Sequence, residues 1–202
     1  VIVRDPSNGS LIGVINRYVN FGTTTTRGVD FDVRSRWTLA IGKIAAQLEA
    51  SYVDRFEQSD RAAENEGGGI SITQYAGRNT GTQTAFPRTR GHMRVELDRQ
   101  DWLYTVSTNY ISDYAQSAAT SGGKPITNAR GEARPTSIPA FITYDLGLGY
   151  RWGKHARING TIRNITDKLP PFDPRMSSYG FAVDQYAPIS RTFNLSFTYK
   201  FD

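Results

Sequence analysis

The feature that most constrains this chain is an alternation of apolar and polar residues that recurs in segment after segment. Within 141–152, most even positions hold Ile, Tyr, Leu or Trp, and most odd positions hold Thr, Asp, Gly or Arg. Successive side chains of a β-strand point to opposite faces, so the pattern predicts a strand with one apolar and one polar face. The final segment repeats the pattern and places on its apolar face Phe193, Leu195, Phe197, Tyr199 and Phe201.

The alternating segments are long. We count seven, each about 9–14 residues in length, whereas strands of water-soluble proteins usually run to about 5–6 residues. They lie at 27–37, 43–56, 88–98, 102–114, 141–152, 156–164 and 193–201. A tilted strand needs about 9–11 residues to cross a bilayer, and a hydrated interior would accommodate the charged residues of the polar faces. The sequence therefore predicts an all-β fold: an antiparallel up-and-down transmembrane β-barrel, of which this chain supplies seven or eight strands.

The connections between these segments alternate in length. Short turns are predicted at 39–42, 99–101 and 153–155. Long connections, rich in Gly and Pro, fill 57–86, 115–138 and 166–189. Unstructured loops of more than about 12–15 residues are uncommon within compact domains, but barrels of the outer membrane carry short periplasmic turns and long exterior loops. The three tryptophans support this orientation, because Trp37, Trp102 and Trp152 each adjoin a short turn and would form an aromatic girdle at the periplasmic boundary.

Residues 1–22 are less regular. The stretch RDPSNGS at 4–10 predicts a turn between two apolar stretches. We expect 1–22 to form an exterior loop or hairpin that leads into the barrel, and 23–202 to form its C-terminal strands. Open strand edges leave backbone groups unpaired in lipid. We therefore expect either 1–22, as an eighth strand, or neighbours outside this chain to complete the pairing.

Three stretches carry recognisable motifs: INGTIRNITDKLPPFDP at 158–174, SRTFNLSFTYKF at 190–201 and YVNFGTTTTRGVDFDVRSRW at 18–37. The first resembles the penultimate strand of TonB-dependent receptors, which ends in an Asn-Leu-Phe-Asp-Lys-like stretch. The second resembles their last strand, and the third is similar to their Asn-x-Gly…Gly-Val-Glu/Asp strand start. Two residues depart from the family pattern: Asp202 follows the final Phe, and Ser190 stands where Gly is common.

This resemblance implies a function and a set of partners. Members of the family are active transport receptors in the outer membrane of Gram-negative bacteria, and they import ferric siderophores, cobalamin or oligosaccharides. An N-terminal plug domain, expected outside this chain, would respond to the TonB complex of the inner membrane. The resemblance also implies contact with outer-membrane lipid and with the barrel-assembly machinery, which reads a terminal aromatic strand such as Phe193 to Phe201.

Two groups of polar residues are candidates for binding. Cationic and aromatic residues of the long loops suit an anionic chelate or a sugar face. These loop candidates are Arg61, Tyr75, Arg78, Arg130, Arg134, Arg175 and Tyr179. The polar faces carry a ladder of charges, comprising Asp30, Asp32, Arg34, Arg36, Lys43, Glu49, Arg88, Arg94, Glu96 and Arg151. The ladder is open to two interpretations: cross-strand pairs that stabilise the sheet, or a surface for plug docking and transport.

Enzymatic and nucleic-acid functions receive no support. His155 falls in a predicted turn, and His92 falls in phase with charged residues, as a wall-lining side chain or a proton-sensitive gate. Neither forms a zinc motif, and a phospholipase would need Ser and His together on the lipid face. The net charge of +5 is spread over many segments, unlike the basic patch of a nucleic-acid-binding protein. We therefore expect no catalytic residue, metal or cofactor.

Two other classes remain open at this point. One is a passive porin or small structural barrel, which would lack a plug domain. The other is a soluble β-sandwich module that binds carbohydrate, which would have to remain folded in water without detergent.

Overall fold

The computed structural model describes residues 2–14, 22–61, 70–79, 85–116, 120–121, 124–125, 127, 131, 136–173, 180–181 and 185–201. All regular secondary structure in these ranges is β-strand. The described residues contain no helix that is long and apolar enough to cross a membrane. The chain divides into two units, Val1–Thr24 with Gln58–Thr73 and Thr25–Glu57 with Gln74–Asp202. Among the described residues, 2–14, 22–24, 58–61 and 70–73 belong to the first unit, and the other features described below lie in the second.

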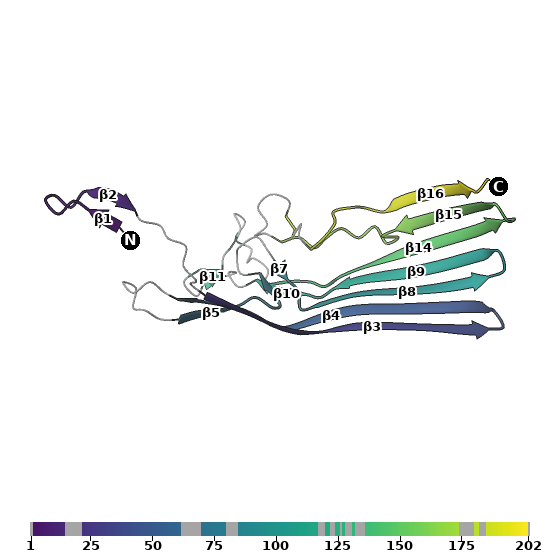
Figure 1. Ribbon diagram of the computed structural model, residues 1–202, viewed down its shortest axis with the longest axis horizontal. Coiled ribbons are helices and arrows are strands. Elements are labelled where there is room, and N and C mark those ends of the chain that lie inside the picture. Colours follow the sequence, from purple (N-terminus) through teal and green to yellow (C-terminus); the bar gives the residue numbers. More distant parts are fainter. Residues whose placement is uncertain are drawn as a thin grey trace. The chain divides into compact units, whose positions relative to one another are not determined.

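The principal element is an eight-stranded sheet, here called the main sheet (Figure 1). Its strands are β3 (Gly22–Leu39), β4 (Gly42–Arg61), β8 (Thr89–Arg99), β9 (Trp102–Ile111), β14 (Phe141–Trp152), β15 (Ala156–Arg163) and β16 (Thr192–Tyr199), with β5 (Ile70–Gln74) paired to β4. Each strand of the series β3, β4, β8, β9, β14, β15, β16 lies beside the one before it. This order confirms the predicted up-and-down arrangement.

The register brings like residues together on each face of the main sheet. On one face, Val106 lies between Val95 and Leu146, and Ile162 continues the row to Phe193. We call this the apolar face. Many of its large side chains are exposed, for example 37% for Leu146 and 78% for Leu195, and others such as Val95 and Ile162 are partly exposed. A sheet that shows such a continuous apolar surface needs a partner or an apolar solvent to cover it.

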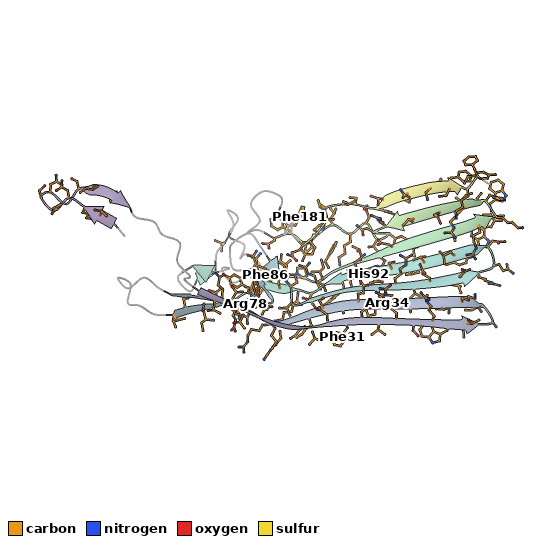
Figure 2. The ribbon with its side chains drawn as sticks, in the orientation of Figure 1. Phe31, Arg34, Arg78, Phe86, His92 and Phe181 are labelled. Carbon is orange, nitrogen blue, oxygen red and sulfur yellow. The ribbon has the colours of Figure 1, made fainter. Side chains whose placement is uncertain are left out.

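The opposite, polar face is equally consistent. His92 lies between Glu49 and Asn109, and Asn109 in turn lies opposite Thr143. Arg34 and His92 are marked on this part of the main sheet in Figure 2. The alternation predicted for each strand is therefore in phase from β4 to β16, because a slip of one residue would mix the two faces.

Three short turns lie at one end of the main sheet, which we call the turn rim (Figure 1). The chain reverses at 40–41, 100–101 and 153–155, as the sequence predicts. Gly42 and Gly153 have positive φ, and a Cβ at Gly42 would collide with the carbonyl oxygen of Asp98. Gly42 is therefore favoured for both conformational and steric reasons, and Gly153 for its conformation alone.

The long connections contain more structure than the sequence predicts. Strand β4 continues to Arg61 and pairs with β5, inside the segment 57–86 that was expected to be a loop. The shorter strands are β6 (Arg78–Asn79), β7 (Ala85–Phe86), β10 (Tyr114–Gln116), β11 (Thr120–Ser121), β12 (Lys124–Pro125) and β13 (Ser137–Ile138). Among them, β6 and β10 pair in parallel, unlike the antiparallel pairs expected throughout. Elements of two or three residues are too short to show a period, which is why the alternation missed them.

Residues 2–14 of the first unit form a separate hairpin. Strands β1 (Ile2–Arg4) and β2 (Leu11–Val14) pair with each other, and the turn between them falls at the predicted RDPSNGS. Asp5 and Asn8 accept backbone hydrogen bonds from Ser7 and Ser10, at 2.8 and 2.9 Å. The hairpin forms its own two-stranded sheet, and β5 is the eighth strand of the main sheet. Of the two expected ways to complete the pairing, the addition of 1–22 as a strand is therefore wrong for the described residues, and pairing with neighbours outside this chain stays a prediction.

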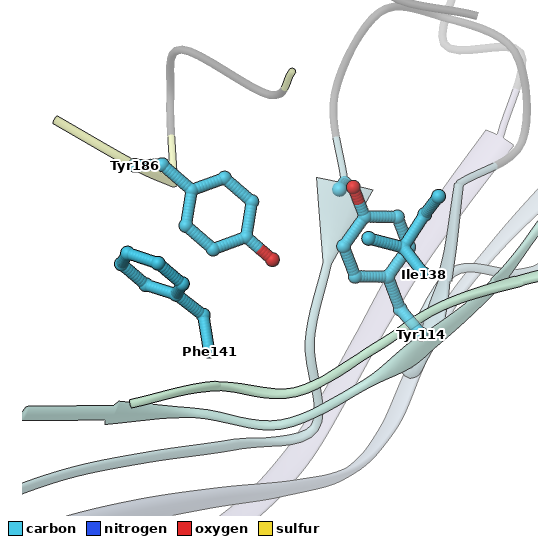
Figure 3. Close-up of a cluster of buried hydrophobic side chains, with 5 residues drawn as sticks. Tyr114, Ile138, Phe141 and Tyr186 are labelled. Carbon is cyan, nitrogen blue, oxygen red and sulfur yellow. The ribbon is translucent and has the colours of Figure 1, made fainter. Parts of the chain in front are cut away.

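The small buried core of the second unit lies beyond the loop-side ends of the main-sheet strands. Strands β13, β10, β6 and β7 form a four-stranded sheet there. Tyr114, Ile138, Phe141 and Tyr186 are buried around it (Figure 3). We call this small sheet with its buried side chains the loop cluster.

Candidate functional site

The polar face of the main sheet forms the floor of a cavity of about 850 Å³. Strands β9, β14 and β15 supply most of the floor, and 185–192 supplies much of the remaining lining. Hydroxyl and amide side chains dominate the floor, among them Thr105, Asn109, Thr143 and Asn159. A wide cavity whose lining combines hydroxyl and amide groups with Leu103, Leu146 and Leu148 can accommodate a hydrophilic solute.

The polar face has two halves of different composition. The charged half comprises β3, β4 and β8, with Asp30, Asp32, Arg34, Arg36, Lys43, Glu49, Arg90, Arg94, Glu96 and Asp98. The neutral half comprises the middle of β9, β14, β15 and β16, where Asp145 is the charged exception and Arg151, Arg157 and Arg163 lie nearer the strand ends. Its uncharged polar-face residues are Thr105, Ser107, Asn109, Thr143, Gly147, Gly149, Asn159, Thr161, Asn194 and Ser196. The cavity lies mainly over the neutral half.

Ion pairs within the charged half are short but exposed. The Arg34 guanidinium lies 2.8 Å from the Asp32 carboxylate and 3.8 Å from Glu49, and Arg94 pairs with Glu96. Two of these three pairs join residues two apart on one strand, whereas the sequence suggested cross-strand pairs. Exposed pairs contribute only about 0–1 kcal/mol each, so they orient side chains more than they hold the sheet together.

Near the turn rim, one ion pair spans three strands. Arg151 of β14 donates to the carboxylate of Asp98 on β8, with one N···O distance of 3.1 Å, and passes over β9. It also donates to the carbonyl oxygen of Gln100 in the turn between β8 and β9. A bidentate Arg–carboxylate pair fixes geometry as well as charge, so this pair ties the rim ends of the three strands together.

A second ion pair lies in phase with the apolar face. Arg27 lies two residues before Val29 on β3, and Asp54 lies two residues after Tyr52 on β4, so both occupy positions of the apolar face. The Arg27 Nε donates to Asp54 Oδ2 at 2.8 Å. The pair interrupts the apolar residues of this face near the loop-side ends of these two strands. Sequence alternation missed it, although Arg and Asp at apolar-phase positions were the available signal.

A buried carboxylate organises the loop cluster. Asp173 is fully buried and accepts hydrogen bonds from Asn79 Nδ2 at 3.2 Å, from the Tyr114 hydroxyl at 2.9 Å and from Gln116 Nε2. These donors come from β6 and β10, whereas Asp173 follows β15. The network therefore attaches the β15–β16 connection to the loop cluster, and the sequence did not reveal it.

The NITDK stretch at 164–168, part of the motif that resembles the family's penultimate strand, joins the two ends of the β15–β16 connection. Asn164, in a left-handed conformation, donates from its side chain to the carbonyl oxygens of Lys168 and Ile189, at 2.9 and 3.3 Å. Asp167 accepts a 2.7 Å hydrogen bond from the backbone N–H of Arg191. Both side chains join the outgoing and returning legs of the connection, which is a structural reason for Asn and Asp in this motif.

The predicted loop candidates fall in different settings. Tyr75 packs against Phe56 and Phe86, with ring centroids 5.4 and 5.6 Å apart, and Arg78 lies exposed on β6 (Figure 2). Arg61 ends β4, and its side chain lies outside the described residues. Also outside them are Arg130, Arg134, Arg175 and Tyr179. Arg88 of the predicted ladder instead donates to the carbonyl oxygens of Val53 and Asp54.

The tryptophans and the last strand lie on the apolar face. Trp37 ends close to one turn of the turn rim, Trp102 follows the second and Trp152 precedes the third, and all three side chains are exposed. The Trp102 ring lies 4.6 Å from that of Tyr150. On the last strand and the residues after it, exposed side chains follow one face: Phe193, Leu195, Phe197, Tyr199 and Phe201.

The histidines take the positions that the alternation indicates. His92 lies on the polar face between Glu49 and Asn109, and His155 lies in a turn with its ring 6.2 Å from that of Tyr199. In the part of the chain that the structure describes, no group of three or more His, Cys, Asp or Glu residues could hold a metal ion.

Comparison with known proteins identifies the sheet. A family model described as "TonB dependent receptor-like, beta-barrel" matches residues 1–165. Among solved structures, a mutant of the ferric enterobactin receptor from Pseudomonas aeruginosa aligns with a TM-score of 0.50 and 16% identity; the alignment covers 88% of this chain and 22% of that one. No curated protein sequence matches the chain. The solved structure supports the fold, and the family match shows that the chain belongs to the TonB-dependent receptor-like β-barrel family.

Proposed function

We propose that this chain forms the C-terminal part of the barrel of an outer-membrane active transport receptor in a Gram-negative bacterium. The observation that carries the proposal is the two-faced main sheet, whose apolar face is exposed from β4 to β16 while its polar face lines a cavity. Lipid around the sheet would account for the exposure of its apolar face. A hydrated lumen would account for the cavity on its polar face.

The whole receptor would act through parts beyond this chain. An N-terminal plug domain would occupy the lumen, and the TonB complex would move it to admit a scarce nutrient: a ferric siderophore, cobalamin or an oligosaccharide. The charged half of the polar face supports plug docking, because its exposed Arg and Asp side chains can exchange partners at little cost.

The orientation in the membrane follows from the two ends of the sheet. The turn rim would face the periplasm, where Trp37, Trp102 and Trp152 form an aromatic girdle at the lipid boundary. The long connections would face outward and capture the nutrient. Arg78 is the candidate that best fits this role, since it is exposed, whereas the partly buried Tyr75 ring would act mainly by packing.

The last strand would serve in assembly as well as in the wall. Its aromatic series from Phe193 to Phe201 lies wholly on the apolar face, which fits both lipid contact and recognition by the barrel-assembly machinery. Deleting Phe201 together with the residue after it should reduce the amount of folded receptor without changing its ligand affinity.

The transport proposal is tested with the full-length receptor that contains this chain. We expect it in the outer-membrane fraction, migrating on gels as a heat-modifiable folded barrel, and supporting nutrient uptake that disappears when the TonB gene is deleted. Uptake that survives this deletion would instead indicate a passive porin. Recovery as a folded monomer in water without detergent would exclude both transport functions.

A further inference from the structure

A groove follows β15 along the apolar face of the main sheet. Strand β15 lies between β14 and β16 (Figure 1). Its apolar-face residues are Ala156, Ile158, Gly160 and Ile162. Gly160 lies opposite Leu148 on one side and Leu195 on the other, and a Cβ added at Gly160 would meet nothing within 4 Å. The missing side chain therefore leaves open space between two large ones.

The flanks of the groove project further than its floor. Phe193 and Leu195 of β16 are 73% and 78% exposed, whereas the four apolar-face residues of β15 are only partly exposed. The central part of the groove has a volume of about 640 Å³, and Leu146 and Leu148 of β14 line its other side. The groove therefore offers a long, narrow strip of apolar surface, which suits an unbranched hydrocarbon chain.

The length of the groove matches one leaflet of a bilayer. Ile162 lies six residues after Ala156, which corresponds to about 20 Å of strand. The strands of membrane barrels are tilted by about 35–45°, so the groove would extend about 15 Å along the membrane normal. This is half of a hydrocarbon core of roughly 30 Å, the part that one acyl chain of a phospholipid occupies.

Cationic side chains lie where the groove reaches the turn rim. The turn between β14 and β15 contains Lys154 and His155. The backbone N–H of Lys200 donates to the carbonyl oxygen of His155 at 2.9 Å, so Lys200 lies beside this turn. Both lysines are exposed, and the described residues 153–155 and 199–201 include no acidic residue. This end of the groove would therefore attract an anionic group.

The charges at the loop-side end of the groove are paired. Arg191, just before β16, has its guanidinium 3.7 Å from the Asp167 carboxylate, which also accepts a hydrogen bond from the backbone N–H of Arg191. Arg163 ends β15 in phase with the polar face. An apolar groove with unbalanced cations at the turn rim fits a ligand with an anionic head and an apolar tail.

From these features we infer that the groove along β15 binds one acyl chain of an anionic phospholipid, whose phosphate lies at the turn rim beside Lys154 and Lys200. The inference rests on the proposed outer-membrane location and goes beyond transport, because this lipid is a partner of the barrel wall and not its cargo. A basic residue near a membrane surface favours anionic lipid by about fivefold, so the two lysines should select phosphatidylglycerol over phosphatidylcholine.

The test uses the full-length receptor reconstituted into phosphatidylcholine vesicles. A trace of either phosphatidylglycerol or phosphatidylcholine carries a photoactivatable diazirine in its acyl chain. Illumination crosslinks this chain to neighbouring side chains, and mass spectrometry of peptides locates the adducts. We expect at least about fivefold more adducts within 146–162 and 193–199 with the phosphatidylglycerol probe than with the phosphatidylcholine probe. Adducts on β3 should not differ between the probes.

One pair of variants tests the groove itself. Gly160→Trp fills the groove, whereas Val33→Trp adds the same ring to an exposed position of the apolar face on β3. We expect Gly160→Trp to reduce adducts within 146–162 to the level found on β3, and Val33→Trp to leave them unchanged. Gly160→Leu is the second filling variant if Gly160→Trp does not give a heat-modifiable barrel.

A second set of variants tests the headgroup site. Lys154→Gln combined with Lys200→Gln should abolish the preference for phosphatidylglycerol while adducts in the groove remain, because the apolar surface is unchanged. Arg99→Gln removes an exposed cation beside the turn at 100–101 and is the matched control. We expect it to leave the preference intact.

Three outcomes would overturn the inference. The two probes could label the groove equally; adducts could be spread evenly over the apolar face; or adducts could be missing from 146–162 and 193–199 alone, which would show that another part of the receptor covers the groove. In each case, adducts elsewhere on the apolar face together with TonB-dependent uptake would leave the transport proposal standing. Absence of adducts from the whole apolar face would contradict the membrane location as well.

Discussion

The main sheet and the loop cluster differ in the burial of their polar and apolar side chains. In the main sheet, Leu195 and its apolar neighbours are exposed, and carboxylates such as Asp98 pair with Arg side chains in the open. In the loop cluster, Tyr114 and Ile138 are buried, and Asp173 is buried with neutral donors around it. One chain therefore contains a sheet with an exposed apolar face and a small core built like that of a water-soluble domain.

The difference between the two regions indicates where a single substitution should change stability most. A buried polar group that loses its partners costs far more than an exposed ion pair that is broken, because water cannot replace the missing hydrogen bonds. We therefore expect the loop cluster to be sensitive to single substitutions of polar residues. The main sheet should be sensitive chiefly on its apolar face.

The largest effect is expected for Asp173→Ala. The substitution leaves the donors of Asn79, Tyr114 and Gln116 without their acceptor, and each buried unsatisfied group costs about 1–3 kcal/mol. We expect faster amide hydrogen exchange and protease cleavage within 164–173, corresponding to a local loss of about 3 kcal/mol or more. Asp173→Asn should have an intermediate effect. Unchanged exchange would show that the network does not hold the β15–β16 connection.

The second largest effect is expected on the apolar face. Leu146→Arg places a charge in the middle of this face and should cost about 2–4 kcal/mol in a bilayer. Thr105→Arg introduces the same side chain on the polar face of the neighbouring strand and should cost much less. Urea unfolding of the receptor in lipid vesicles measures both variants. Equal costs would mean that the two faces do not differ in their surroundings.

A smaller effect is expected for Asp98→Ala, the exposed counterpart of Asp173→Ala. This change removes the rim pair with Arg151, in which the Asp98 and Arg151 side chains are 40% and 35% exposed. The loss should be at most about 1 kcal/mol after solvent screening, and it should shrink further at high salt. A loss comparable to that of Asp173→Ala would remove the distinction between the two regions.

The smallest effect concerns the β1–β2 hairpin of the first unit. The Ser7 hydroxyl, and then the Ser7 backbone N–H, donate to Asp5 and hold the pKa of its carboxyl below the ordinary value. A depressed pKa stabilises the turn above the unfolded pKa of about 3.9 and loses this contribution as pH falls through the folded value. NMR of the hairpin amides should show loosening below about pH 4, which Asp5→Asn abolishes. Identical titrations in Ser7→Ala would contradict the assigned cause.

The sequence predicted the main sheet well because its information is local. A period of two assigns each residue of a strand to a face, and the short turns fix which strands are neighbours. This reasoning placed Trp102, His92 and Phe197 on the faces where the structure has them. It underestimated the lengths of β3 and β4, because their added residues, 22–26 and 57–61, carry no apolar/polar alternation. The added part of β4 lies in the segment 57–86 that was predicted to be a loop.

The candidate site was predicted only in part. Charged residues of the polar face were identified, but the partners of Arg34 and Arg94 were not, because pairs two residues apart compete with cross-strand pairs. The loop candidates were chosen by residue type alone, and packing decides whether such a residue is available. Arg78 is exposed, whereas Tyr75 lies in an aromatic group with Phe56 and Phe86.

The alternation by itself determined that this chain forms a two-faced antiparallel sheet, with Trp37, Trp102 and Trp152 beside its short turns. The assignment of residues to the two faces depends only on positions two apart in the sequence. It applies wherever the two faces of a strand have different surroundings. Only the tertiary structure decided the loop cluster, where Asn79 and Asp173 meet across 94 residues of sequence. It also decided that Arg151 reaches Asp98 over an intervening strand. Contacts of this kind depend on how distant segments are brought together, which no local period records.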